Sequence, residues 1–313
     1  MPLKKTNKLH KAFLILLMGL WASPDVLAQD LEPRRWSHLP TGLNFIGVGS
    51  GLTSGDIFFD PLLLIEDAEF KLYNLAASYV RSFQLFDKSA RIDVLAPYGS
   101  GRWEGIVDGV DTSVRRRGFM DPRLRFTINL YGAPPLDRKA FAEYRAANPV
   151  ATTVGMSFTL VPPLGKYYED KLINLGENRW RFRTQLGVLH RRGPWEFELT
   201  GSVSVFSDND KFFQNTVREQ DPLLFGQAHL IYTFRPGLWL SASTGYAWGG
   251  ENFVNDNAKN DAYKKAFLAL SLGLPINRQQ GVKLAWLSGR TNTDRGYDGD
   301  TFLFAWSYMW GKH

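Results

Sequence analysis

The chain has 313 residues, of which 44% are hydrophobic and 14% aromatic, and its formal net charge is +6. It contains no cysteine, which excludes disulfides and a cysteine-linked lipid anchor. The charge is too balanced to favour nucleic acid as a partner, and no apolar run after residue 28 reaches the roughly 18 residues of a membrane-spanning helix.

The first 28 residues have the pattern of an export signal. A basic region with Lys4, Lys5, Lys8 and Lys11 precedes a short apolar stretch at 12–21, and the small-residue pattern ends at Ala28. We predict cleavage after Ala28, which leaves 285 residues (313 − 28) and a net charge of +3 (33 basic minus 30 acidic residues). Residues 29–40 would then form a short, irregular periplasmic lead-in, which could reach into a lumen although none of its residues requires it.

Alternating apolar and polar residues predict twelve strands along the rest of the chain. They lie near 41–50, 70–85, 89–98, 122–131, 151–161, 178–190, 194–206, 223–235, 237–248, 264–276, 281–289 and 301–310. Most have the length that a tilted strand needs to cross a bilayer. Short connections alternate with long ones, such as 51–69, 99–121 and 162–177, as periplasmic turns alternate with extracellular loops in outer-membrane barrels.

One connection that should be a short turn is longer. Residues 136–147, between Pro134 and Pro149, have an amphipathic helical pattern. We therefore expect one short helix at the periplasmic end.

The last strand carries an aromatic residue at every second position. Phe302, Phe304, Trp306, Tyr308 and Trp310 would share one face. In an outer-membrane barrel this face meets lipid. We predict an all-β, antiparallel transmembrane barrel of about twelve strands over residues 41–313, located in the outer membrane; a soluble periplasmic β-protein is the alternative.

The polar faces of these strands predict the residues that line the lumen, because an arginine at mid-bilayer on the lipid side would cost about 2–4 kcal/mol. The face of Arg81 is not decided by the pattern. The candidate lumen or constriction residues are Asp93, Arg123, Arg125, Arg179, Arg181, Arg183, Glu196, Glu198 and His229. These charges either neutralise one another and fill the interior, or form a polar constriction that favours anions on a permeation path.

Other motifs carry little chemistry. The glycine-rich stretch 47–51 is not followed by a helix, so we expect no nucleotide cofactor. Acidic clusters at 208–210, 255–257 and 298–300 are expected to be solvated outer loops, with divalent cations at the lipopolysaccharide surface as the alternative. Neither His190 nor His229 lies in a recognisable Ser/His signature, so we expect no enzymatic activity and no catalytic or metal-binding residues.

Several stretches resemble a known family. They are SGDIFFDPL at 54–62, LAPYGSGRWEG at 95–105, GFMDPRLR at 118–125 followed by NLYGAP at 129–134, and DKLINLGENRW at 170–180. On these residues the chain resembles the MetA-pathway phenol-degradation family of outer-membrane proteins, whose members are described as transporters. The resemblance extends over about residues 35–313 and implies a transmembrane barrel that passes hydrophobic or aromatic molecules, without indicating which residues contact them.

Three hypotheses follow. The first is a channel that passively admits small hydrophobic or aromatic solutes through the outer membrane, with lipid and lipopolysaccharide around it. The second is a closed structural or surface-binding barrel whose charges block the interior. The third is a lipid-modifying enzyme that depends on His190 or His229.

Overall fold

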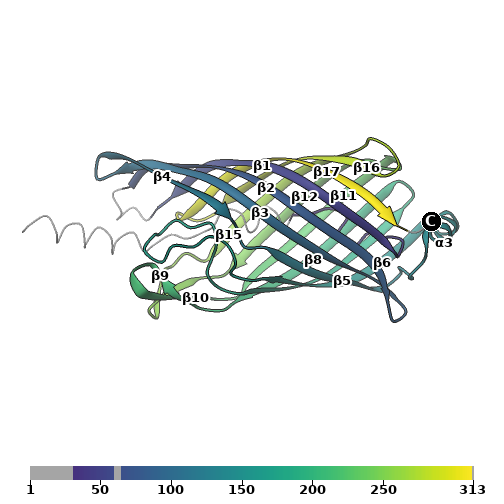
Figure 1. The fold of residues 1–313 in the computed structure, drawn as a ribbon, viewed down its shortest axis with the longest axis horizontal. Coiled ribbons are helices and arrows are strands. Elements are labelled where there is room, and N and C mark those ends of the chain that lie inside the picture. The colour runs from purple at the N-terminus through teal and green to yellow at the C-terminus, as the bar shows by residue number, and fades with distance from the viewer. Residues whose placement is uncertain (1–30, 60–64, 312–313) are drawn as a thin grey trace, which may run out of the picture.

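The computed structural model describes residues 31–59 and 65–311. Twelve antiparallel strands of this part form one closed barrel, because β2 pairs with both β1 and β3 (Figure 1). The strands are β1 (Leu43–Phe58), β2 (Ile65–Leu85), β3 (Lys88–Val107), β5 (Arg123–Tyr131), β6 (Val150–Val161), β7 (Arg181–Arg192), β8 (Trp195–Phe206), β11 (Leu223–Arg235), β12 (Leu238–Gly249), β15 (Tyr263–Pro275), β16 (Gln280–Thr291) and β17 (Gly296–Gly311). The predicted fold class and strand number are confirmed.

The first and last strands close the barrel. β1 pairs with β17 along its whole length, from Leu43 opposite Gly311 to Phe58 opposite Gly296. Phe302 and Phe304 on β17 are exposed on the outer face, and nearer the end of the strand the rings of Tyr308 and Trp310 stack at 5.9 Å. The aromatic alternation of the last strand therefore belongs to the lipid-facing wall, as predicted.

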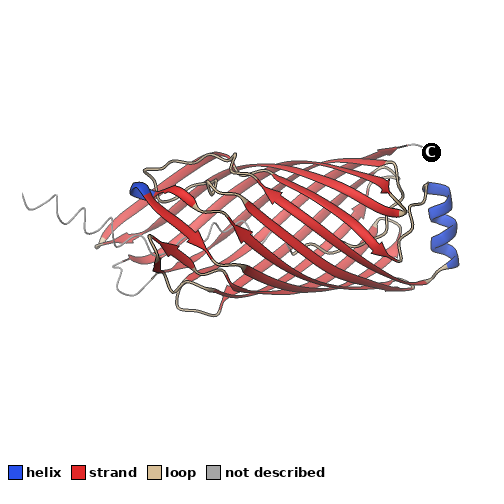
Figure 2. Cartoon of the chain, turned by 90° about the horizontal axis from the view of Figure 1, so that it is seen from below, coloured by secondary structure: helices blue, strands red, loops and turns tan. Residues whose placement is uncertain are grey.

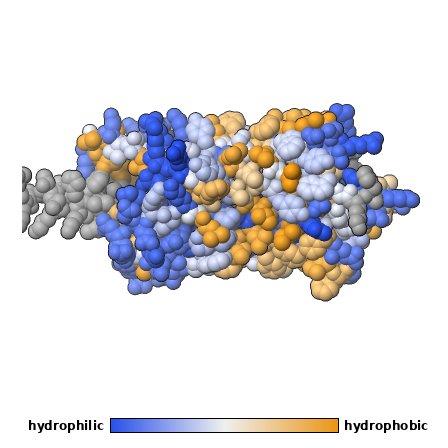
Figure 3. All heavy atoms as spheres, viewed as in Figure 1, coloured by the Kyte–Doolittle hydropathy of each residue, from blue (hydrophilic) through white to orange (hydrophobic). Residues whose placement is uncertain are grey.

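The outer surface of the barrel carries an apolar belt (Figure 3). Leucines such as Leu186, Leu230 and Leu270 are about half exposed on it, because their neighbours along each strand point into the lumen. Arg81 is exposed and lies two residues from Tyr79, whose hydroxyl donates a hydrogen bond to Asn44 and whose ring lies 6.4 Å from that of Trp310. Arg81 thus faces outward at the rim of the belt, where the cost of a charge is small.

The predicted helix is present as α3 (Arg138–Ala147), between β5 and β6. Asp137 caps it by accepting a hydrogen bond from the backbone N–H of Ala140. α3 lies at the end of the barrel that also holds the C-terminus (Figure 2). The short turns lie at this end, so it corresponds to the periplasmic end. In the part of the chain that the structure describes, no helix is long and apolar enough to cross a membrane.

The opposite end is more ordered than the sequence predicts. The stretches expected as loops at 51–69 and 99–121 are largely strand: β1, β2 and β3 continue outward, and β4 (Val110–Phe119) pairs with the outer part of β3. The loop prediction was wrong there, because strands beyond the membrane need no apolar face and so lose the alternating pattern. Smaller strands beyond the wall form a second sheet: β9 (Asn209–Phe212), β10 (Thr216–Gln220), β13 (Asn252–Val254) and β14 (Asn257–Ala258), with the 3₁₀ helix η2 (Phe213–Asn215) after β9.

Candidate functional site: the lumen and the segment that fills it

Residues 31–40, called the plug segment below, run through the barrel interior before β1 begins. Leu31 and Arg35 are each 5% exposed and Trp36 is 0% exposed. This segment belongs to the stretch that sequence analysis treated as a lead-in before the barrel. The residues of the predicted export signal lie outside the described part of the chain.

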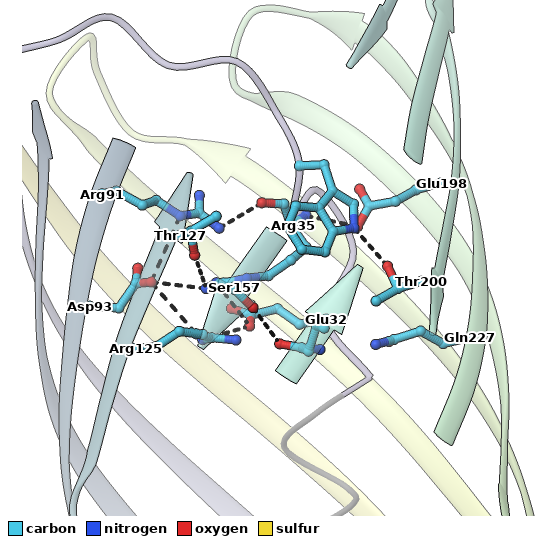
Figure 4. Close-up of polar contacts among 12 residues, drawn as sticks. Glu32, Arg35, Arg91, Asp93, Arg125, Thr127, Ser157, Glu198, Thr200 and Gln227 are labelled. Carbon is cyan, nitrogen blue, oxygen red and sulfur yellow. Dashed lines mark hydrogen bonds and ion pairs between the residues drawn. The ribbon is translucent and has the colours of Figure 1, made fainter. Parts of the chain in front are cut away.

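Arg35 is the polar centre of the plug segment (Figure 4). Its Nη2 donates to Asp93 Oδ2 at 2.9 Å and to Thr127 Oγ1 at 3.1 Å, and its backbone N–H donates to Glu198 Oε1 at 3.0 Å. Its carbonyl oxygen accepts a 2.6 Å hydrogen bond from Arg91 Nη2. Arg35 therefore joins β3, β5 and β8 across the lumen.

A second ion pair continues this network. Arg125 Nη2 donates to Glu32 Oε2 at 3.1 Å, and Arg125 Nε lies 3.5 Å from Asp93 Oδ2. Glu32 Oε2 is also 3.6 Å from Arg35 Nη1. Charges on the plug segment and on the wall thus alternate, and each carboxylate faces more than one arginine, which offsets the cost of burying charge.

Trp36 occupies a niche built from two glycines. Gly155 on β6 and Gly187 on β7 are cross-strand partners, and a Cβ added at either would overlap the Trp36 ring. The indole Nε1 donates to Thr200 Oγ1 at 2.7 Å. The two glycines therefore leave space for the indole ring against the wall, and Thr200 supplies an acceptor for its N–H.

The two ends of the plug segment contact different surroundings. Leu31 packs in an apolar cluster with Leu223, Phe225, Phe267 and Leu287. Toward the periplasmic end, Arg34 Nε lies 3.6 Å from Glu196 Oε2. Arg145 Nη2 lies 3.4 Å from Glu196 Oε1 at the same end. His38 Nε2 lies 2.7 Å from the Pro134 carbonyl oxygen, and the His38 ring lies 4.8 Å from that of Phe141. The segment is thus held along most of its length.

The candidate residues are distributed over several parts of the lumen. Asp93, Arg125 and Glu198 meet around Arg35, whereas Glu196 lies nearer the periplasmic end. The others are distributed as follows: Arg123 begins β5 two residues before Arg125; Arg179 and Arg181 lie at the outer end within 2.8 and 3.8 Å of Glu177; Arg183 donates to Ser202; and His229 is hydrogen-bonded to Ser243 at 2.7 Å and Gln227 at 3.1 Å. Their role as a constriction stays a prediction.

Sequence reasoning missed Glu32, Arg34, Arg35 and Trp36. The plug segment has no helical or strand periodicity, so nothing in its pattern indicates where it lies. The wall does carry a sequence signal for a buried segment. Gly155 and Gly187 stand at inward positions of neighbouring strands, where larger side chains would otherwise fill the lumen.

The outer mouth is covered by the connection 162–180. The Asp121 carboxylate accepts 2.7 Å hydrogen bonds from the backbone N–H groups of both Gly165 and Glu177. Leu175 packs inside the mouth with Phe70, Leu72 and Trp103, among others. Two stretches that carry the family resemblance, 118–125 and 170–180, therefore meet in space.

The pKa values of two carboxyl groups at this connection, Asp121 and Glu177, are shifted in opposite directions. Burial raises the pKa of Asp121 to about 6, although the two N–H donors act in the opposite direction. Burial alone would also raise the pKa of Glu177, but Arg179, Arg181 and Arg218 outweigh it and lower that pKa to about 2. Both groups lie in connections outside the membrane-spanning strands.

Space beside the plug segment is small. One cavity of about 20 Å³ lies between Arg35, Ser82, Arg91 and Asn129, and another of about 20 Å³ lies near His38 and Arg145. A single water molecule needs a cavity of about 10–15 Å³. These cavities hold about one water each and are too small for an aromatic solute.

In residues 31–59 and 65–311, no group of three or more His, Cys, Asp or Glu side chains could hold a metal ion. His229 and Ser243 form a buried pair on the inner wall, and His190 Nδ1 contacts Thr152 Oγ1 at 2.9 Å. His229 is 1% exposed, so a lipid does not reach it in this conformation.

Comparison with known proteins gives a family and a fold. The model of a family described as a MetA-pathway of phenol degradation matches residues 64–305. None of the curated proteins matches the chain.

Solved structures are similar to this chain to different degrees. An outer-membrane channel from Pseudomonas putida F1 is 21% identical, with a TM-score of 0.74 over 89% of this chain and 99% of that one. The translocator domain of the autotransporter NalP from Neisseria meningitidis is 10% identical, with a TM-score of 0.47 over 90% and 93%. The CymD monoaromatic hydrocarbon channel is 8% identical, with a TM-score of 0.44 over 88% and 90%. The fold is that of the Pseudomonas putida channel.

Proposed function

Because the chain belongs to the family described as a MetA-pathway of phenol degradation, we propose that it is an outer-membrane channel for small aromatic or otherwise hydrophobic compounds. In this proposal solute diffuses passively, and no energy-coupling partner or cofactor is needed. The plug segment closes the lumen in the described conformation, and solute passes when that segment moves.

The observation that carries the proposal is what fills the lumen. Twelve strands enclose more space than the eight strands whose side chains fill a barrel, and less than the sixteen or more of open porins. Here Leu31, Arg35 and Trp36 occupy that space. They belong to a segment before β1 rather than to the wall, so the interior can open without any change in strand pairing.

The contacts of the segment suit a reversible closure. Several are hydrogen bonds and ion pairs to wall residues that have other partners: Asp93 also faces Arg91 and Arg125, and Glu196 also faces Arg145. Release of Arg35 therefore does not leave Asp93 as an isolated buried charge, which would cost about 3–5 kcal/mol. Cleavage after Ala28, also a proposal, would leave the segment attached to the barrel only through β1.

The test is uptake by liposomes that contain the refolded protein. Phenol-like aromatics, aromatic acids and a sugar of similar size are compared with the leak of protein-free vesicles, which is large for neutral phenols. Faster entry of the aromatic compounds than of the sugar supports the proposal. Equal entry of all solutes indicates a general pore, and entry of none contradicts transport.

One observation favours the second candidate, a closed structural barrel. The plug segment is packed tightly, with Trp36 fully buried in a fitted niche. This candidate predicts negligible conductance for the protein, and none gained when the contacts of the segment are removed. Conductance that rises on such removal would exclude it.

A further inference from the structure

On the outer face of β2, β3 and β4 beyond the membrane, cationic side chains lie opposite one another in a row across neighbouring strands. The register places Lys71 opposite Arg102, and Arg102 opposite Arg115. Cross-strand partners share one face of a sheet, and all three side chains are exposed. Arg117, two residues further along β4, adds a fourth exposed cation to the same face.

Three of these four cations have no ion-pair partner among the described residues. Like charges directly opposite each other destabilise an antiparallel pair. Arg102 forms an ion pair with Glu104. For Lys71, Arg115 and Arg117, no residue in 31–59 or 65–311 supplies a carboxylate within ion-pair distance. An external anion would remove the repulsion.

The height of the row is set by its neighbours along the strands. Two residues nearer the membrane, the next cross-strand row consists of Tyr73, Ser100 and Arg117. Two residues further toward the membrane, the following row consists of Leu75, Tyr98 and Phe119. The rings of Tyr98 and Phe119 meet edge to face at 5.4 Å. Aromatic residues of this kind mark the membrane interface. Lys71, Arg102 and Arg115 therefore lie four residues of strand rise, about 13 Å, beyond the row of Tyr98 and Phe119. Arg117 lies two residues, about 7 Å, beyond Phe119.

The hydropathy of the surface agrees with this placement. In Figure 3 a hydrophilic zone at the β4 end adjoins the apolar belt. Glu69 and Glu104, which face each other, lie one row further out than the cations. Positive charge is thus concentrated where lipid headgroups of the outer leaflet lie, and negative charge further from the membrane.

We propose that Lys71, Arg102, Arg115 and Arg117 form a site for the phosphate groups of lipid A, the anionic anchor of lipopolysaccharide. Guanidinium groups bind phosphate oxygens in pairs, and basic residues just outside a membrane bind anionic headgroups. Lys71 and Arg115 lie two strand spacings apart, about 10 Å. A row of this length fits a headgroup with two phosphates better than one with a single phosphate. The site does not depend on whether the barrel transports.

The test is a binding titration of the refolded, full-length protein in detergent. The probes are lipid A carrying its inner-core sugars, the same lipid after removal of its phosphates, and phosphatidylglycerol. The variant is Lys71→Gln/Arg115→Gln/Arg117→Gln, in which Arg102 keeps its pair with Glu104. A matched control, Arg192→Gln/Arg235→Gln/Arg278→Gln, removes three exposed cations from the periplasmic turns instead.

We expect the variant to bind phosphorylated lipid A about tenfold or more weakly, since each basic residue near an anionic surface contributes about 1 kcal/mol. The control variant should bind like the parent, and the lipid without phosphates should bind weakly to all three. Equal affinity of parent and variant would overturn the proposal. So would equal binding of phosphatidylglycerol or of the lipid without phosphates.

Folding is checked by the heat-dependent change in electrophoretic mobility that intact barrels show. Should the triple variant not fold, Arg115→Gln/Arg117→Gln changes only β4, which pairs with β3 outside the closed barrel wall. The same titration then decides the matter, with Arg192→Gln/Arg235→Gln as its control.

Discussion

Trp36 is fully buried where the plug segment packs against the wall. Replacing a buried Trp with Ala costs about 3–5 kcal/mol in protein cores. Here that loss falls on the docking of the segment, because Trp36 packs against strands whose own pairing does not involve it. For Trp36→Ala we expect single-channel conductance in planar bilayers to rise well above that of the parent.

The matched control is Trp195→Ala. Trp195 is 49% exposed on the outer wall, against the ring of Tyr232 at 4.7 Å. It removes the same side chain without touching the lumen, so its conductance should equal that of the parent. An unchanged conductance in Trp36→Ala would show that the segment does not control passage.

Gly187 tests the same niche from the wall side. A Cβ there would overlap Trp36 Nε1, so Gly187→Ala should expel the indole although the plug segment itself is unaltered. We expect increased conductance, together with a shift of tryptophan fluorescence toward longer wavelength. Gly201→Ala is the control, since a Cβ at Gly201 meets nothing within 4 Å. Adding Gly187→Ala to Trp36→Ala should change little, since both act on one contact.

Residue-level prediction from the sequence succeeded where a periodic strand carries the side chain. Alternation alone placed Asp93, Arg125 and Glu198 on inward faces, and the structure brings them together around Arg35. It could not supply Arg35 itself, because an irregular segment has no face that a pattern could reveal. The partners of the predicted charges were therefore assigned to one another rather than to the plug segment.

At the scale of elements, the membrane explains both the success and the failure. Within the bilayer each strand must be apolar outside and polar inside, so the alternation located all twelve wall strands. β1 and β3 nevertheless continue eight and nine residues beyond their predicted ends at 50 and 98. β4 contains Arg115, Arg116 and Arg117 in succession and shows no such alternation. β4 pairs with β3 through backbone hydrogen bonds, which leave no hydrophobic pattern in the sequence. The sequence therefore indicated a loop.

The cover over the outer mouth should respond to pH through Asp121. Its pKa is about 6 when the connection 162–180 is docked, against an ordinary value near 3.9 when it is released. The docked state therefore holds the proton more tightly, and docking strengthens as pH falls through 6 toward 4. Glu177 acts in the opposite sense, because its pKa is about 2 when docked and near the ordinary value of about 4.3 when released. Its contribution begins below about pH 5, so the effect of Asp121 dominates between pH 7 and pH 5. Hydrogen exchange of amides 165–177, corrected for intrinsic rates, should slow between pH 7 and pH 5.

Asp121→Asn supplies the control for that experiment. An amide of the same shape does not titrate, so the corrected exchange of the connection should become independent of pH. One of its two positions now carries a donor facing a backbone N–H, so exchange should also be faster at every pH. A pH dependence equal to that of the parent would assign the effect to another group.

For the whole molecule, the charge that solutes meet depends on where the plug segment is. With the segment docked, Glu32 and Arg35 share a network with the wall. When it leaves, it takes Glu32, Arg34 and Arg35 with it. The described wall residues that face the vacated space then include the cations Arg91, Arg123, Arg125, Arg183 and Lys283 and the carboxylates Asp93, Glu196 and Glu198. An opened lumen is therefore more positive than negative.

We expect the opened Trp36→Ala channel to prefer anions, shown by the sign of its reversal potential in a KCl gradient. Aromatic carboxylates should then enter liposomes faster than aromatic amines of similar size. Arg183 is the residue to change, because it lies on the wall strand β7 and donates to Ser202 on the neighbouring strand. In the Trp36→Ala background, Arg183→Gln should move the reversal potential toward cations, whereas Arg192→Gln at the periplasmic turn should leave it unchanged. A preference for cations in the opened channel would mean that Glu196 and Glu198, not the arginines, face the solute path.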